Sequence, residues 1–186
     1  MIARFHMRNN KVLRLTLSAL FLALGILLPF LTGNNRQLGN IFSLMHIPVL
    51  LCGFVCGWKH GLFIGFVTPL LRSLIIGMPP MLPIALGMAF ELAAYGALAG
   101  ILYKVMPRNI PGLYAALILS MLGGRLVWGL ASYIIYTAMG NPFTLQMFMA
   151  AAFITPLPGI IFHLVIIPPI LLALKAYRLL PEEAAA

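Results

Sequence analysis

The sequence predicts an all-α integral membrane protein with six transmembrane helices and both termini on the cytoplasmic side. Three observations support this fold class. The chain has 186 residues, of which 62% are hydrophobic and only 8% are charged, whereas soluble domains carry roughly a quarter charged residues. The apolar residues form long runs that match the about 20 helical residues needed to cross a bilayer. The segments between the runs are too short to hold a soluble domain.

The apolar runs predict six spans, each with its own character. The first follows a basic segment. No small-residue cleavage site follows its apolar run, which favours a retained span over a cleaved signal peptide. The second is short, so we expect it to tilt little or to begin within the preceding loop. The sixth contains Pro156 and Pro158, which predict a break in its helix. The expected spans are residues 13–31, 43–57, 61–77, 82–103, 112–138 and 146–174.

The distribution of basic residues predicts the topology. The net charge of +9 comes from twelve Lys and Arg against three acidic residues. Nine basic residues lie at one set of span ends, and only Arg36 lies at the other. The positive-inside rule places the basic set in the cytoplasm. We expect a single transmembrane domain over residues 1–186, with a basic cytoplasmic lead at 1–12 and a tail at 177–186. The nine residues are Arg4, Arg8, Lys11, Arg14, Lys59, Lys104, Arg108, Lys175 and Arg178.

Sequence motifs of catalysis are not found in the chain. It has no phosphate-binding loop, no nucleophile elbow and no cluster of metal ligands. Cys52 and Cys56 lie one helical turn apart in an apolar stretch, where free cysteines behave as small apolar residues. We therefore expect a protein that is not an enzyme and that needs no cofactor or metal. The position of the basic residues also speaks against binding of nucleic acid.

Three ionisable residues lie inside the predicted spans: Arg72, Glu91 and Arg125. Each costs about 2.5–3.5 kcal/mol or more at a helix centre, so such residues indicate a functional site. At 1.5 Å per residue, all three fall near one level in the middle to outer half of the bilayer. One interpretation is a structural ion pair between Glu91 and either arginine. One positive charge would then remain unpaired. An anionic ligand would neutralise it, or water in an outward-open cavity would solvate it.

The neighbours of these charges predict a pocket. Arg125 shares one helical face with Trp128, Ser132 and Tyr136, at spacings of three, seven and eleven residues. Glu91 shares a face with Tyr95. An aromatic wall with a few polar groups is typical of small-molecule sites. Ordinary packing or an interfacial aromatic belt is the alternative, and for Tyr136 we favour it.

Two histidines and one loop complete the candidate site. His46 opens the second span and His163 lies in the sixth, both toward the outer side on the predicted topology. A single histidine in a membrane helix is more often a packing residue than a ligand contact. The outer loop between the first two spans carries Asn34, Asn35 and Arg36. It is either a plain connector or a lid above an outward-facing pocket.

Several blocks of sequence resemble the substrate-binding S components of energy-coupling factor (ECF) vitamin transporters. The resemblance covers nearly the whole chain and includes the basic N-terminus, six helices and a pair of alanines four residues apart in the first helix, Ala19 and Ala23. Within that family, the blocks are similar to the pantothenate-type branch. The most specific ones are HIPVLLCG at 46–53, GFVTPLLRS at 65–73, GMPP at 77–80, AFEL at 89–92 and GRLVWG at 124–129.

The resemblance implies a fold and a function. An S component is a six-helix bundle that binds a vitamin from outside, joins a membrane T component and two cytoplasmic ATPases, and reorients to release its ligand. Its pocket would use the first outer loop and helices four to six, which here carry Asn34 to Arg36, Glu91, Tyr95, Arg125, Trp128 and His163. Arg72 is outside that set, and we include it among the candidate substrate-binding residues because of its estimated depth in the bilayer. Ala19 and Ala23 would face the T component.

The sequence is compatible with more than one ligand. The surplus of arginine favours a vitamin with a carboxylate, for which pantothenate is the best candidate. A pyridoxine-type or pyrimidine-type ligand would instead stack on Trp128 and use Glu91 as its acceptor. Outside this family, the chain would be a standalone secondary transporter with Glu91 as proton carrier, although no inverted repeat is visible.

Overall fold

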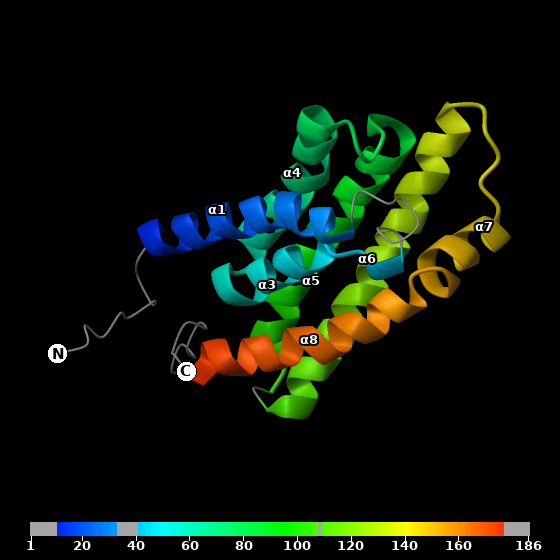
Figure 1. The fold of residues 1–186 in the computed structure, drawn as a ribbon. Helices are drawn as coiled ribbons and strands as arrows, with labels where there is room; N and C mark the ends of the chain where they lie inside the picture. Colours follow the sequence, from blue (N-terminus) through cyan, green and yellow to red (C-terminus); the bar gives the residue numbers. More distant parts are fainter. Residues whose placement is uncertain (1–10, 33–40, 108, 177–186) are drawn as a thin grey trace.

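The computed structural model describes residues 11–32, 41–107 and 109–176, and every element in these ranges is helical. The predicted all-α class is confirmed. Along the chain the elements are α1 (Lys11–Leu27) with the 3₁₀ turn η2 (Leu28–Thr32), α3 (His46–Cys56), α4 (Trp58–Ile76), the π-helical turn η3 (Met81–Ala85), α5 (Leu86–Val105), α6 (Ile110–Ala138), α7 (Leu145–Met149), the π-helical turn η4 (Ala150–Ile154) and α8 (Leu157–Ala176) (Figure 1).

Each predicted span falls on one of these helices. Five helical stretches are long and apolar enough to cross a membrane, and α3 is a shorter apolar helix of 11 residues. The expectation that the second span is short is therefore confirmed. The predicted break in the sixth span is also present, because η4 ends at Ile154 and α8 begins at Leu157 after Pro156. Proline removes a backbone donor and clashes with the preceding turn, which interrupts a continuous helix.

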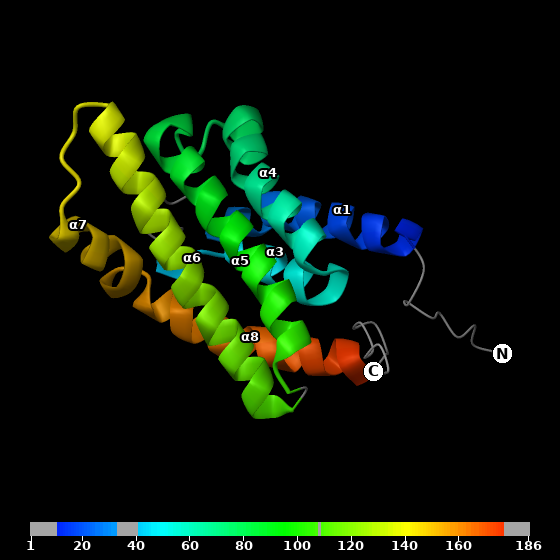
Figure 2. The ribbon, with the colours of Figure 1, turned by 180° about the vertical axis from the view of Figure 1, so that it is seen from behind.

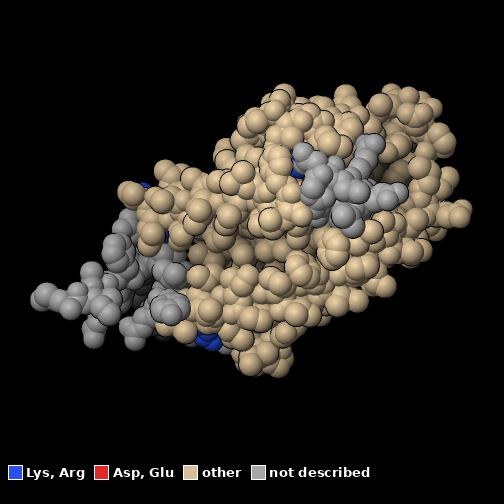
Figure 3. Space-filling view, viewed as in Figure 1, with Lys and Arg blue, Asp and Glu red and all other residues tan. Residues whose placement is uncertain are grey.

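The helices form two layers. Views from the two sides show α4, α5 and α6 in one layer and α1, α3 and α8 in the other (Figures 1 and 2). The buried core lies mainly between α3 and α5, where every residue of α3 is buried. Many large apolar side chains are exposed on the outside as well, and the described part of the face in Figure 3 shows almost no charged residues. An apolar exterior around a buried polar centre is what a bilayer requires.

Glycines allow α5 to approach α4, its neighbour in one layer, and α3, in the other layer, backbone to backbone. A methyl group on Gly96 of α5 would overlap the carbonyl of Gly61 in α4. A methyl group on Gly53 of α3 would overlap the carbonyl of Gly96 from the other side. Small residues at such crossings permit close packing, which drives helix association in lipid. This crossing fixes α5, the helix that carries Glu91 and Tyr95.

Basic residues collect at one end of the bundle. Lys11 begins α1, Lys59 is the second residue of α4, and Lys104 and Lys175 lie in the last turns of α5 and α8. The first residue of α1 and the last of α8 lie on the same side of the molecule (Figure 1). This arrangement agrees with an even number of crossings. The predicted lead at 1–12 and tail at 177–186 fall almost entirely outside the described residues.

Candidate functional site

A buried ion pair forms the centre of the site. Arg125 Nη1 on α6 lies 3.0 Å from Glu91 Oε1 on α5, and the two side chains are 8% and 3% exposed. Gly124 makes this approach possible, since a methyl group there would overlap the ring of Tyr95 and lie 3.1 Å from the carbonyl oxygen of Glu91. The sequence prediction that Glu91 meets an arginine is confirmed, and that arginine is Arg125.

His46 contacts the same carboxylate from α3. Its Nδ1 and its backbone N–H both lie 2.9 Å from the carbonyl oxygen of Ser43. Because a carbonyl only accepts hydrogen bonds, Nδ1 carries a proton and Nε2 is directed toward the centre. His46 Nε2 lies 3.6 Å from Glu91 Oε1. Ser43 has φ of 48°, a left-handed conformation that non-glycine residues adopt rarely. This local turn sets the direction of the imidazole.

His163 of α8 packs on His46. The two imidazoles stack with ring centroids 6.0 Å apart and an interplanar angle of 28°, and His163 is only 1% exposed. The ring of Tyr95 also packs on His46, with its centroid 5.3 Å away. Helix α8 reaches this position because Gly159 packs directly on the backbone of residues 41–42.

Several buried polar atoms around this centre make no hydrogen bond to any described residue. Buried polar groups are nearly always satisfied, and each one left without a partner costs about 1–3 kcal/mol. Such atoms therefore point to a site that receives a polar ligand. They are His46 Nε2, Glu91 Oε1, Tyr95 Oη, Arg125 Nε and both ring nitrogens of His163.

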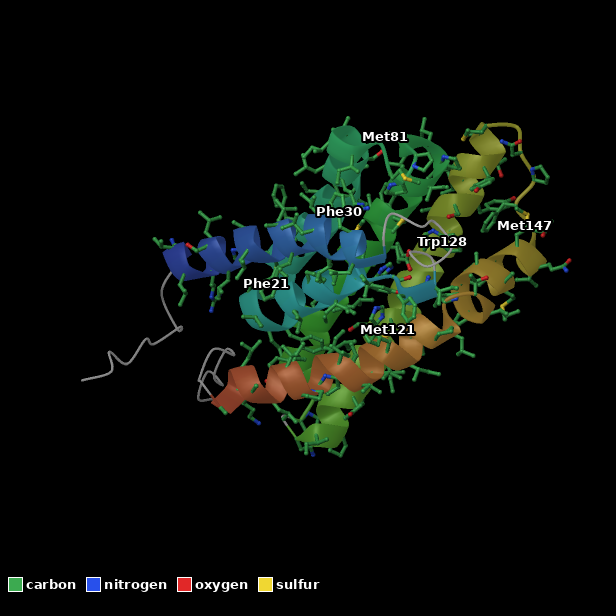
Figure 4. The ribbon with its side chains drawn as sticks, in the orientation of Figure 1. Phe21, Phe30, Met81, Met121, Trp128 and Met147 are labelled. Carbon is green, nitrogen blue, oxygen red and sulfur yellow. The ribbon has the colours of Figure 1, made fainter. Side chains whose placement is uncertain are left out.

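Trp128 joins the centre to an aromatic cluster. It lies on α6 on the side where α7 approaches (Figure 4). Its ring stacks with that of Phe148 at 6.2 Å and 22°, and meets the ring of Phe143 edge-on at 5.9 Å. On α5, a methyl group on Gly87 would lie 3.5 Å from Trp128 Nε1 and 3.3 Å from Ser132 Oγ. The predicted shared face of Arg125, Trp128 and Ser132 is thus turned toward α5.

Phe143 and Phe148 were not among the residues predicted for the site. Phe143 lies in the connector after α6, and Phe148 lies in α7. No helical period therefore links either residue to Trp128. Their aromatic character was the only available signal. Tyr136 also contacts Phe143, at 5.4 Å between centroids, which agrees with a packing role for Tyr136.

Arg72 has a different setting. Its Nη1 donates to the carbonyl oxygen of Ile26 at 2.9 Å, and its Nε donates to that of Met78 at 3.1 Å. Its guanidinium also lies 5.4 Å from the ring centroid of Phe30. These contacts connect α4 to the C-terminal end of α1 and to the connector before η3. Arg72 is buried, with 5% exposure.

The remaining predicted residues are distributed as follows. Ala19 and Ala23 are both on α1 and both exposed. Asn34, Asn35 and Arg36 lie outside the described residues. Cys52 and Cys56 are free thiols buried in α3, in agreement with an apolar packing role.

The arrangement offers polar and aromatic contacts to a small ligand. It contains a balanced Arg–Glu pair, two imidazoles, a tyrosine and an aromatic wall, all held inside an apolar bundle. Comparison with protein families gives one decisive result: a family model described as "ECF transporter, substrate-specific component" matches residues 13–171. The chain belongs to this family. Comparison with curated proteins and with solved structures gave no match.

Membership in the family establishes the general role. The protein is the S component of an ECF transporter, a multi-pass membrane subunit that binds a substrate for uptake and is not an enzyme. The family implies a small substrate and work with a T component and ATPases. It favours this role over a standalone secondary transporter.

Proposed function

We propose that this S component captures a carboxylate-bearing vitamin from outside the cell, with pantothenate as the best candidate. The observation that carries the proposal is a buried donor without an acceptor: Arg125 Nε makes no hydrogen bond to any described residue. Glu91 balances the charge of Arg125 through Nη1, and Arg72 lies apart, on the carbonyl oxygens of Ile26 and Met78. A ligand carboxylate would give Nε a charged acceptor, and charge-assisted hydrogen bonds of this kind are the strong ones.

The hydrogen-bonding groups at the centre support a ligand that both accepts and donates. Arg125 Nε is a donor only, so it requires an acceptor such as a carboxylate or amide oxygen. A neutral imidazole offers one donor and one acceptor, so His163 requires both kinds of group. Pantothenate has a carboxylate, an amide and two hydroxyls, which supply each of these. Trp128 then forms the apolar side of the pocket.

A pyridoxine-type or pyrimidine-type ligand is the second candidate in the same family. Its support is Trp128, on which a flat ring would stack, and Glu91, which would accept from a ring nitrogen. Arg125 and His46 lie 3.0 Å and 3.6 Å from Oε1 of Glu91 and would compete with a ring nitrogen for that oxygen, although Oε1 makes no hydrogen bond of good geometry to a described residue. We place the acid first because Arg125 Nε requires an acceptor.

Calorimetric titration of the purified protein separates the two ligands. The panel is pantothenate, pyridoxine and a hydroxymethyl pyrimidine, each added to the wild type, Arg125→Lys, Arg125→Ala and Glu91→Gln. Arg125→Lys keeps the positive charge but loses the planar fork that recognises a carboxylate. We expect pantothenate to bind and to lose affinity in both Arg125 variants. Preferred binding of a basic ring ligand that Glu91→Gln abolishes would overturn the proposal.

The topology and the partner contact are further parts of the proposal. We infer that the end carrying Lys11, Lys59, Lys104 and Lys175 is cytoplasmic, by the positive-inside rule. The exposed alanines of α1 then form the surface for the T component, since small residues four apart permit close helix approach in lipid. Two ATPases would drive reorientation and release. Uptake by the isolated protein in liposomes, driven by a pH gradient alone, would contradict this mechanism.

A further inference from the structure

Two hydrogen-bond acceptors face each other at the buried centre. His46 Nδ1 lies 2.9 Å from the carbonyl oxygen of Ser43, so Nδ1 carries the proton of the neutral imidazole and Nε2 is left as an acceptor. This acceptor lies 3.6 Å from Oε1 of Glu91, and both side chains are 3% exposed. An ionised carboxylate is also an acceptor. One additional proton between the two atoms would turn this repulsive contact into a charge-assisted hydrogen bond.

Groups on α5, α6 and α8 face this pair, but in the described part of the chain they do not supply the missing donor. His46 Nε2 and Glu91 Oε1 both lack a hydrogen-bond partner among the described residues. The hydroxyl of Tyr95 and the ring nitrogens of His163 are unpartnered as well, so neither donates here. Arg125 Nη1 contacts Oε1 at 3.0 Å and leaves Nε2 without a donor.

The charged side chains of α1 and α4, which also pack on α3, lie elsewhere. Arg72 of α4 donates to two backbone carbonyl oxygens, outside this centre. The remaining basic groups of α1 and α4 lie in the first turns of these helices, at the basic end. His46 begins α3, and α4 begins after α3 ends, about 15 Å away along α3. These basic groups are Lys11 and Arg14 of α1 and Lys59 and His60 of α4.

Charge balance gives an independent reason for the same proton, and this step rests on the proposed carboxylate substrate. In the free site Glu91 balances Arg125. A bound carboxylate adds a second negative charge, which leaves one negative charge in excess inside an apolar bundle. Such a buried, uncompensated charge is strongly unfavourable. A proton on His46 returns the sum to zero and also supplies the donor that Glu91 lacks.

We propose that the substrate carboxylate binds together with one proton, which is held between His46 Nε2 and Glu91 Oε1. The proton comes from water and adds to the lone pair of Nε2, and no covalent bond of the substrate changes. The vitamin is therefore held as the electrical equivalent of its neutral acid. Because binding consumes a proton, the affinity for the vitamin falls as the pH rises.

Calorimetric titration of the full-length protein with pantothenate, in buffers of different ionisation enthalpy, counts the linked protons. At about pH 8 carboxylates are ionised and unperturbed histidines are neutral. We expect the wild type to take up close to one proton per bound pantothenate, and its affinity to fall by up to about tenfold for each further pH unit. Pantothenate binding without proton uptake would overturn this inference and leave the proposed function intact. Absence of pantothenate binding would overturn both.

The variant His46→Gln tests where the proton is held. Its amide donates to Glu91 without taking up a proton. We expect it to bind pantothenate more weakly than the wild type, with little proton uptake and with an affinity that hardly changes with pH. Proton uptake equal to that of the wild type would overturn the assignment to His46. Unchanged unfolding temperature excludes misfolding as the cause, and the wild-type proton count tests the proposal independently of any variant.

Two other histidine variants serve as comparisons. His163→Gln removes the imidazole that stacks on His46, so it should weaken binding but keep the proton uptake per bound vitamin. His60→Gln, in the first turn of α4 at the basic end, should match the wild type in both affinity and uptake. Loss of the uptake in His163→Gln, with its retention in His46→Gln, would assign the proton to the other imidazole and contradict the proposal.

Discussion

The Nη1 nitrogen of Arg125 lies 3.0 Å from Oε1 of Glu91, and this buried ion pair connects α6 to α5. Two charges taken out of water are stabilised only when each has its partner. Removing one partner leaves an uncompensated buried charge, whereas removing both does not. The pair therefore has a structural role as well as a role at the substrate site, and the two roles can be separated by experiment.

A double-mutant cycle should show strong coupling between Glu91 and Arg125. We expect Glu91→Gln and Arg125→Gln each to lower the free energy of unfolding by about 3–5 kcal/mol, because each leaves one buried charge unpaired. The double variant should lose less than the sum of the two. Unfolding in detergent, followed by tryptophan fluorescence, measures the cycle. Lys104→Gln, at an exposed lysine of α5, serves as the control, and additive losses would contradict the buried pair.

The glycine crossing of α4 and α5 should be intolerant of a methyl group. Gly96→Ala would place its Cβ on the carbonyl of Gly61, and backbone cannot move aside. We expect a loss of about 1–3 kcal/mol, as found for overpacked cores. Gly123→Ala is the matched comparison, because its Cβ would meet only the end of the Leu98 side chain, which can rotate. A loss in Gly123→Ala as large as that in Gly96→Ala would refute this packing.

The exposed alanines of α1 should matter for transport but not for binding. We expect Ala19→Leu with Ala23→Leu to abolish uptake by the assembled transporter, because the larger side chains prevent close approach of the T component. Vitamin affinity of the isolated S component should stay unchanged. Ala173→Leu, at an exposed alanine of α8, provides the control. Normal uptake by the double variant would show that this surface is not the contact.

Trp128 should report ligand binding by fluorescence. The chain has two tryptophans, and Trp58 lies at the basic end, at the start of α4. We expect a ligand-dependent change in emission to persist in Trp58→Phe and to disappear in Trp128→Phe. If the change follows Trp58 instead, the ligand binds at the other end of the bundle and the assigned site is wrong.

Much of the fold could be predicted from sequence because membrane helices are specified by length and apolarity. All six spans were located, and so was the break near Pro156. An ion pair of Glu91 with either Arg72 or Arg125 was one interpretation of the sequence, since isolated charges in lipid need a partner, but the sequence did not indicate which arginine it would be. These predictions rest on strong local constraints that involve few residues at a time.

Other features of the site depend on how helices that are distant in the sequence pack against one another, and these features were not predictable. His46 is directed at Glu91 by the left-handed turn at Ser43, which no helical period reveals. Its stacking on His163 depends on the packing of α8 through Gly159. Arg72 was placed at the depth of the other charges, but depth along a helix does not specify direction, and its hydrogen bonds extend to Ile26 and Met78.

Native mass spectrometry of the gently purified wild-type protein tests the central claim most directly, by the mass of any small molecule that is purified with it. We expect a single bound species with the mass of pantothenate, which is lost when Arg125 is replaced by Ala. A bound vitamin without a carboxylate that is retained in Arg125→Ala would show that the charged centre does not bind a carboxylate.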